Sequence, residues 1–299
     1  MSTAELAATP DGGALVVGDR APGAVRQWLR LLASELRLIF RRWRNLALLA
    51  VLVILPVVLG IGLKVAGPNG GGGGGPDATF FSQLAGNGVF LAFIALSILL
   101  TLVLPLVIAV VSGDSLAGEA GAGTLRYLLT VPAGRTRLLA VKYTAVVIFG
   151  LAACLLVTVV SLIMGVILFP VGPVTLLSGT TVSLGVGLLH LFYVTLYVTA
   201  AMAALGAIGL AISSFTEHPI GAIAAVLVLA VASEVADQVA QFAVIHPYLP
   251  THFWLSFDSL LRTPIDTSSL LHGLLSFAVY IVIFCSIAWA RFASADVTS

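Results

Sequence analysis

The stretch LALLAVLVILPVVLGIGL, Leu46 to Leu63, carries no charged side chain and is long enough for a helix to cross the apolar core of a bilayer. Of the 299 residues, 60% are hydrophobic and 9% are charged, against roughly 25% charged in a typical soluble domain. Five further apolar runs follow, at residues 89–111, 145–169, 182–212, 220–244 and 270–290. The sequence therefore predicts an all-α integral membrane protein with six transmembrane helices within residues 46–291.

Two of these runs leave alternatives open. The run at 182–212 is longer than one span needs, so a tilt, a break near Gly185–Gly187 or a start in the interface would each accommodate it. The run at 220–244 contains Glu234 and Asp237, and charges inside a span are costly. If this run were re-entrant rather than spanning, the C-terminus would lie on the outer side of the membrane.

The positions of the basic residues predict the orientation. Of the 14 Lys and Arg residues, Lys64 and Arg262 fall in predicted outer loops, and the remaining twelve fall on the other side. This asymmetry is typical of cytoplasmic loops, so both termini are expected in the cytoplasm of a cell with a bacterial-type plasma (inner) membrane. Residues 1–24 lack the pattern of a cleavable signal and are expected to form a disordered cytoplasmic tail. The net charge of +1 gives no reason to expect nucleic acid as a partner.

Residues 25–45 have an amphipathic helical pattern. At about 100° per residue, the arginines gather on one side, and Trp28, Leu32, Leu36, Ile39 and Trp43 gather on the other. The segment is expected to lie flat on the inner leaflet, either as a plain interfacial anchor or as an elbow helix that also touches a cytoplasmic partner. The residues predicted to anchor it at the membrane surface are Arg26, Trp28, Arg30, Arg37, Arg41, Trp43 and Arg44.

Two loops are predicted on the outer side. Residues 64–88 contain a run of glycines and are expected to be flexible. Residues 246–264, between the fifth and sixth spans, are aromatic and are expected to form one or two short interfacial helices. The aromatic residues expected at the outer interface are Tyr248, Phe253, Trp254 and Phe257.

Several strings imitate catalytic motifs, but their context argues against chemistry. The tetrapeptide GDSL at residues 113–116 follows a predicted membrane helix, and no Asp-x-x-His partner motif exists in the chain. The glycine-rich string GEAGAGT at residues 118–124 lacks the lysine of a phosphate-binding loop. The histidines show no metal-ligand spacing, and Cys154 and Cys285 lie in apolar runs as small core or lipid-facing residues. The chain is thus expected to have no catalytic, cofactor-binding or metal-binding residues of its own.

Polar side chains inside the outer halves of the spans are candidates for a transport pathway. His190, Tyr193 and Tyr197 share one helical face, as do Glu234 and Asp237. The alternatives are an aromatic stripe that packs one helix on another, and a fifth helix that ends early so that its two carboxylates meet external water or pair with Arg262.

The run SGDSLAGEAGAGTLRYLLTVPAGRTRLLAVKY, residues 112–143, closely resembles the loop between the second and third spans of ABC-2 type transporter permeases. The matching positions are Asp114, Glu119, Gly123, Thr124, Leu125, Leu128, Leu129, Pro132, Arg135 and Lys142. Outside this run the likeness is one of layout, with six spans, an amphipathic helix before the first, and a hydrophobic outer segment between the last two.

The resemblance implies the permease subunit of an ATP-driven exporter of hydrophobic or amphipathic substrates, such as drugs, peptides or lipid-linked compounds. Its partners would be a dimer of cytoplasmic ATPase subunits, which would hold ATP and Mg, and a second permease copy or a paralogue. Residues 112–142 would be the cytoplasmic coupling loop, with a short helix near 115–130 that exposes Glu119, and with Arg137 and Lys142 at the membrane surface. The residues expected to dock the ATPase are Asp114, Glu119, Gly123, Thr124, Leu125, Arg126, Leu129, Pro132 and Arg135.

Two other classes remain as alternatives. A secondary transporter would need paired charges and broken helices at mid-membrane in inverted repeats, and no repeat is visible. A membrane assembly protein that transports nothing would keep the apolar spans and lack the coupling.

Overall fold

The computed structural model describes residues 24–66, 87–123, 135–176, 178–262 and 265–294. Among them, six helices are long and apolar enough to cross a membrane, so by length and composition the chain is a multi-pass membrane protein. These helices are α2 (Trp43–Ala66), α5 (Val103–Gly121), α7 (Arg135–Leu168), α8 (Leu184–Ser213), α9 (Pro219–Asp237) and α10 (Thr267–Ser294). The glycine-rich run at 67–76, most of the outer loop 64–88 and most of the tail 1–24 lie outside the described residues.

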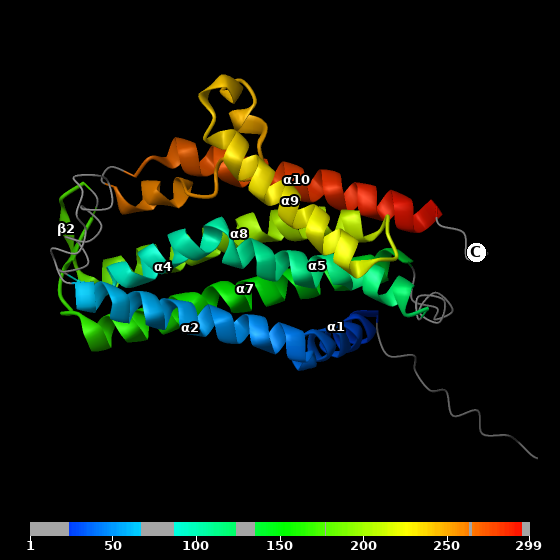
Figure 1. Cartoon of the computed structure of the whole chain (residues 1–299), viewed down its shortest axis with the longest axis horizontal. Helices are drawn as coiled ribbons and strands as arrows, with labels where there is room; N and C mark the ends of the chain where they lie inside the picture. The colour runs from blue at the N-terminus through cyan, green and yellow to red at the C-terminus, as the bar shows by residue number, and fades with distance from the viewer. Residues whose placement is uncertain (1–23, 67–86, 124–134, 177, 263–264, 295–299) are drawn as a thin grey trace, which may run out of the picture.

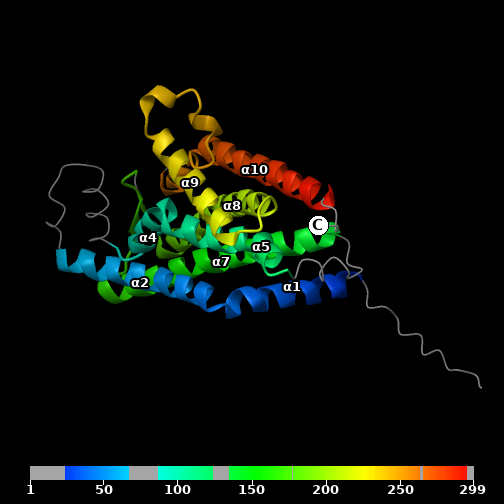
Figure 2. The same cartoon turned by 45° about the vertical axis from the view of Figure 1, so that its right-hand side comes forward.

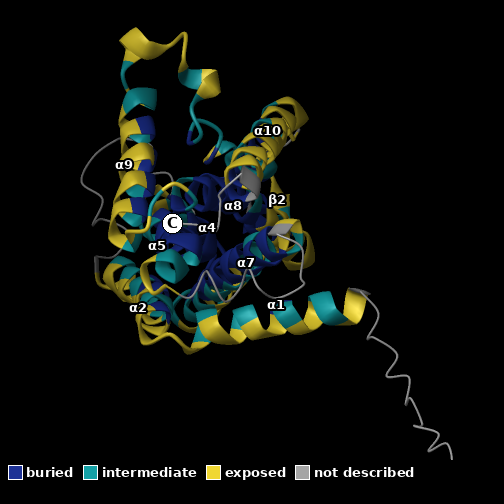
Figure 3. Ribbon diagram, turned by 90° about the vertical axis from the view of Figure 1, so that its right-hand side faces the viewer, coloured by how far each residue is buried: buried dark blue, intermediate teal, exposed yellow. Residues whose placement is uncertain are grey.

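The helices form one bundle with α5 and α8 at its centre. Both are largely buried, whereas α2, α9 and α10 expose most of their apolar side chains, as lipid-facing helices do. Figures 1 and 2 show α5, α7 and α8 between α2 on one side and α9 and α10 on the other. Figure 3, which looks along the bundle, shows the same buried centre inside an exposed shell.

The second apolar run is two helices rather than the single predicted span 89–111. α4 (Phe90–Thr101) ends at Leu102, whose φ of −139° is not helical, and α5 then runs on to Gly121. Pro105 explains the break, because it has no N–H to donate to the carbonyl of Thr101 and its ring crowds that carbonyl. The prediction of a coupling loop over 112–142 was therefore wrong at both ends, since 112–121 belong to α5 and 135–142 to α7.

The run predicted at 182–212 forms a helix without a break at Gly185–Gly187. Its first residue belongs instead to a two-stranded antiparallel hairpin, β1 (Val174–Thr175) and β2 (Thr181–Val182), which the sequence did not reveal. The buried Asn87 holds this hairpin to the start of α4, because its Nδ2 donates to the carbonyls of Gly172 and Pro173 at 2.5 and 3.1 Å.

The fifth span ends early, as one of the alternatives allowed. α9 stops at Asp237, and three short 3-10 helices follow, η1 (Ala240–Phe242), η2 (His246–Tyr248) and η3 (Ser256–Leu261). Residues 238–262, which we call the outer segment after the side of the membrane predicted for them, thus contain short helices as expected, but not all their aromatic residues are exposed. Tyr248 is exposed, whereas Trp254 and Phe257 are buried against the core, so their assignment to the outer surface was wrong.

α1 (Ala24–Arg41) precedes the first span and ends four residues before the predicted boundary. Trp43 therefore does not belong to its apolar face but begins α2, where it is 83% exposed. The rest of that face packs on α7, with Leu32 against Val141 and Ala145, rather than being free for the lipid.

Two backbones touch directly where α7 passes the start of α4. A Cβ built on Gly165 would overlap the carbonyl oxygen of Gly88, and one built on Gly88 would overlap that of Gly165. We expect Gly165→Ala to lower the free energy of unfolding by about 1–3 kcal/mol, because the two helices would have to separate. Thermal unfolding of the detergent-solubilised protein, followed by circular dichroism, would measure this.

Gly62→Ala is the matched control. Gly62 is also helical, but a Cβ there would meet nothing within 4 Å, so alanine should stabilise α2 by up to about 1 kcal/mol. Equal effects of the two substitutions would contradict the close contact at Gly165.

Candidate functional site

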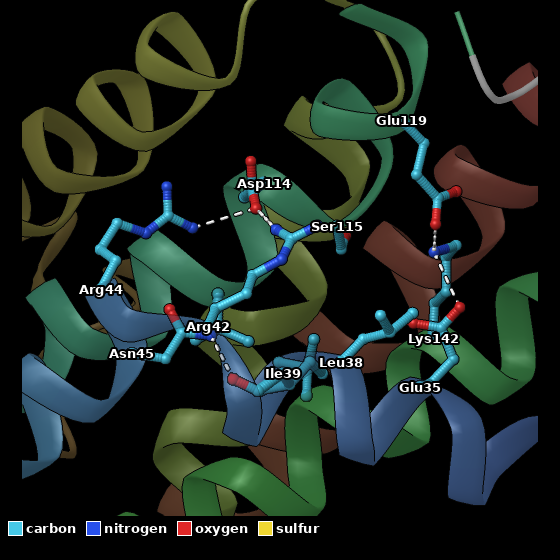
Figure 4. Close-up of a pocket in the computed structure, with 12 residues that line it drawn as sticks. Glu35, Leu38, Ile39, Arg42, Arg44, Asn45, Asp114, Ser115, Glu119 and Lys142 are labelled. Carbon is cyan, nitrogen blue, oxygen red and sulfur yellow. Dashed lines mark hydrogen bonds and ion pairs between the residues drawn. The ribbon is translucent and has the colours of Figure 1, made fainter. Parts of the chain in front are cut away.

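Six charged side chains from four elements meet at one end of the bundle (Figure 4). We call them the charge cluster: Glu35 of α1, Arg42 at the α1–α2 junction, Arg44 of α2, Asp114 and Glu119 of α5, and Lys142 of α7. Three are basic and three acidic, so the cluster as a whole is neutral.

Asp114 ties α5 to the start of α2. Its Oδ2 accepts hydrogen bonds from Arg42 and, at 3.0 Å, from Nη2 of Arg44. The two arginines are aimed at it because the chain turns at Arg42, between α1 and α2. Asn45 fixes this turn, since its Nδ2 donates to the carbonyl of Ile39 at 2.9 Å, one of the carbonyls that the end of α1 leaves unpaired.

Lys142 ties α7 to both α1 and α5. Its Nζ lies 3.2 Å from Oε1 of Glu35 and 2.5 Å from Oε1 of Glu119, and its side chain is 2% exposed. A buried ammonium group is costly unless it is paired, and here two carboxylates from two other helices pair with it. Lys142 thus joins three helices through one group.

Ser213 of α8 attaches the same part of α5 to the centre of the bundle. Its Oγ donates to the carbonyl of Gly113 at 2.7 Å, and it accepts from the backbone N–H groups of Leu116 and Ala117 at 3.1 and 2.8 Å. One hydroxyl therefore holds three backbone groups of α5, and all three lie between Asp114 and Glu119 or next to them.

The cluster borders a cavity of about 30 Å³. That is room for about one water molecule, which is too little for an organic ligand. Asn45 lines the cavity, and its Oδ1 is buried with no hydrogen-bond partner among the described residues. Because each charge is paired across helices and the space is small, the arrangement can hold helices together, but it has no room for a substrate.

The structure corrects the expected positions of two residues. Glu119 was predicted to be exposed for a partner, but its side chain is 16% exposed and pairs with Lys142. Lys142 was predicted at the membrane surface, but it is buried. Both errors have one cause, because burying either charge alone carries a large desolvation penalty, which the attraction between the two offsets when they meet.

The other predicted docking residues are only partly described. Gly123 is exposed and has a φ of 68°, a conformation that glycine adopts freely and that commonly ends a helix. Arg135 is the first residue of α7. The remaining predicted contacts lie outside the described residues, namely Thr124, Leu125, Arg126, Leu129 and Pro132.

The anchor residues predicted before the first span have different environments. Arg44 pairs with Asp114, and Trp28 packs partly buried against α7, so neither is a free surface anchor. The four remaining arginines, Arg26, Arg30, Arg37 and Arg41, are exposed.

The candidate pathway residues on α8 do not share one environment. Tyr197 is buried, its hydroxyl donates to the carbonyl of Phe253 at 2.8 Å, and its ring lies edge-on to Phe277 of α10. Tyr193 is exposed and His190 is half-buried. Tyr197 therefore packs helices together as the aromatic-stripe alternative described, and a pathway at His190 and Tyr193 stays a prediction.

Glu234 and Asp237 lie half-buried at the end of α9, beside the outer segment. Oδ1 of Asp237 is 2.6 Å from Nδ1 of His252 and 3.9 Å from Nδ1 of His246. Arg262, considered as their partner, instead lies 3.2 Å from Asp258. Asp237 and His252 thus fasten the outer segment to α9.

The side chains that could bind a metal ion or act as nucleophiles do not form a site within the described part of the chain. Within the described ranges, no three His, Cys, Asp or Glu side chains are placed to hold a metal ion. Cys154 and Cys285 are both free thiols, one buried and one half-buried, in α7 and α10.

Sequence reasoning missed Arg42, Glu35 and Ser213 as partners of the candidate loop. One signal was available for the charges, because Asp114 and Glu119 lie next to an apolar span and a carboxylate there needs a basic partner. Nothing in the sequence singled out Ser213 among the serines of the chain.

The class of the protein follows from its fold, since six apolar helices define a multi-pass membrane protein. Residues 77–298 match a family described as "Protein of unknown function (DUF2705)", and the chain belongs to this family. No curated protein matches the chain.

The buried position of Lys142 makes a specific prediction. Lys142→Met should lower the free energy of unfolding by about 3–5 kcal/mol, because it removes the ammonium group that Glu35 and Glu119 share and leaves two carboxylates close together. The triple variant Lys142→Met, Glu35→Gln, Glu119→Gln should recover most of this loss. Thermal unfolding in detergent measures the stability of both variants. Lys64→Met is the control, because Lys64 is exposed near the other end of α2, and its free energy of unfolding should stay within about 0.5 kcal/mol of that of the unaltered protein. A triple variant no more stable than Lys142→Met would contradict the cluster.

The bond between His252 and Asp237 leads to a second testable prediction. His252→Gln should loosen the outer segment, so that hydrogen exchange of residues 238–262 becomes about tenfold faster, the effect of losing one hydrogen bond to a charged group. His272→Gln is the control, because His272 is exposed and bonds to the carbonyl of Ser268 in its own helix. Unchanged exchange in His252→Gln would show that this bond does not hold the segment.

Proposed function

We propose that this chain is the transmembrane subunit of an ATP-driven exporter of the ABC-2 type. It would work as a pair, with a second copy or a paralogue, and would bind a dimer of cytoplasmic ATPase subunits that supply ATP and Mg. Its cargo would be hydrophobic or amphipathic, and its membrane the inner membrane of a bacterial-type cell. The resemblance of residues 112–143 to the coupling loop of these permeases is the starting point.

The observation that carries the proposal is the bracing of both helices that flank residues 124–134. α5, which leads into this segment, is bonded to α2 through Asp114 and to α8 through Ser213. α7, which leads out of it, is bonded to α1 and α5 through Lys142. A force applied to residues 124–134 would therefore reach five helices through polar contacts within a few turns.

Such bracing is what coupling requires. A partner can drive a conformational change only if its own state changes the relative stability of two arrangements of the permease. Rigidly connected helices allow a displacement at a loop to move a whole bundle rather than bend one helix. A loop that served only as a connection would not need three helices fastened at its base.

The arrangement of chain ends supports the expected orientation. α1, the end of α5, the start of α7 and the end of α10 all lie at one end of the bundle (Figure 1). Most described basic residues lie in these parts of the chain, whereas Lys64 lies in the last turn of α2 and Arg262 follows η3. A positively charged end is expected to face the cytoplasm, where an ATPase partner would be found.

Glu119 is a poor probe of docking, because changing it would also disrupt Lys142. Arg126→Glu is a better one, and we expect it to reduce the amount of co-purifying ATPase at least about tenfold, since reversing a charge in a docking loop removes an attraction and adds a repulsion. The measurement is affinity purification of the tagged chain, co-expressed with an ABC-type ATPase from the same genome, and quantification of the bound ATPase.

Arg262→Glu is the matched control. It makes the same charge reversal in the outer segment, and it should leave ATPase binding unchanged. The proposal fails if Arg126→Glu retains as much ATPase as the unaltered chain while both variants remain folded by circular dichroism.

A further inference from the structure

α1 presents two different faces, and only one has a partner in the described structure. Leu32, Trp28 and Ile39 pack towards α7, where they contact the region of Val141 and Ala145. Arg137 strengthens this contact, because its Nη1 donates to Oε1 of Gln27 at 3.1 Å. These apolar residues of α1 are therefore used within the protein, whereas Val25, Leu29 and Leu38 of the same helix are exposed.

The opposite face carries an arginine row, which we define as Arg26, Arg30, Arg37 and Arg41. All four are exposed, and at about 100° per residue they lie within roughly 60° of one another. None of the four forms an ion pair with a described residue, whereas Arg42 and Arg44, the next arginines along the chain, both pair with Asp114. The row is thus a concentrated positive charge without a counter-ion in the described part of the chain.

The position of α1 places this row at the level of lipid headgroups. α1 runs across the view in Figure 3, which looks along the bundle, so it lies across the helices that span the membrane. It joins α2 at Trp43, which is 83% exposed, and exposed tryptophans at the ends of spans favour the boundary between headgroups and acyl chains. The arginine row begins next to this boundary and points away from α7.

We propose that the arginine row binds the phosphate groups of anionic phospholipids and concentrates these lipids around α1. Guanidinium groups bind phosphate oxygens in pairs of parallel hydrogen bonds, and several clustered arginines near a membrane surface attract anionic lipids. Apolar contacts do not distinguish one headgroup from another, so the charge of the row is what discriminates anionic from zwitterionic lipids. This inference does not rest on the proposed transport function, since it involves neither a partner ATPase nor a cargo.

Quenching of Trp43 tests the proposal, because this residue adjoins the row. The protein with Trp43 as its sole tryptophan (Trp28→Phe, Trp254→Phe, Trp289→Phe) is reconstituted in phosphatidylcholine vesicles in which one fifth of the lipid is brominated phosphatidylglycerol or brominated phosphatidylcholine. We expect the brominated anionic lipid to quench Trp43 at least about twofold more than the zwitterionic one. The preference should shrink in 0.5 M salt, which screens exposed charges.

Two sets of variants separate charge from structure. Replacing the four arginines by glutamine should abolish the preference, and replacing them by lysine should retain most of it, because lysine keeps the charge. A second reporter, with Trp289 as the sole tryptophan, lies exposed near the end of α10 and should show a much smaller preference.

Three results would overturn the proposal. Equal quenching by the two lipids in the unaltered row would show that it does not select anionic lipids. A preference that survives in the glutamine variant would assign it to other residues. If the glutamine variant instead loses a bound acidic protein while the unaltered protein shows no lipid preference, the row is a protein-docking surface. Size-exclusion elution and circular dichroism establish that each variant is folded.

Discussion

The structure depends on one buried ammonium group. Lys142 is almost fully removed from solvent and lies between carboxylates of α1 and α5, so three helices share one charge interaction. In a low-dielectric setting, such a group is stable only when carboxylates are in place to offset its desolvation. Moving α7 away from α1 and α5 would therefore leave a buried ammonium group without the carboxylates that it pairs with.

The six spans could be predicted because the bilayer imposes a length and a composition on every helix that crosses it. The breaks could not be predicted in the same way. Pro56 and Pro105 both lie inside apolar runs, yet α2 continues through Pro56 and the second run breaks before Pro105. Whether a proline breaks a helix depends on what neighbouring helices offer to the freed carbonyl, and that information is not local.

The candidate site could also be predicted only in part, because its contacts are not local in the sequence. The resemblance to a coupling loop drew attention to Asp114 and Glu119, but it implied an exposed position for Glu119, which is instead paired with Lys142. Their partners are remote in the sequence, with Arg42 separated from Asp114 by 72 positions and Lys142 from Glu119 by 23. Small residues beside the carboxylates allow other segments to approach closely, since a Cβ on Gly113 would meet Ile223 and one on Gly121 would meet the carbonyl oxygen of Glu217.

The break at Leu102 divides the second apolar run into two separate helices, α4 and α5. α5 is bonded to α2, α7 and α8, whereas α4 contacts mainly α7. An unbroken helix would transmit a tilt at one end to the other end, because it would move as a rigid rod. With a joint at Leu102, α5 can change its angle to α4 while α4 keeps its backbone contact with α7 at Gly88 and Gly165, so a displacement at the far end of α5 need not reach the start of α4.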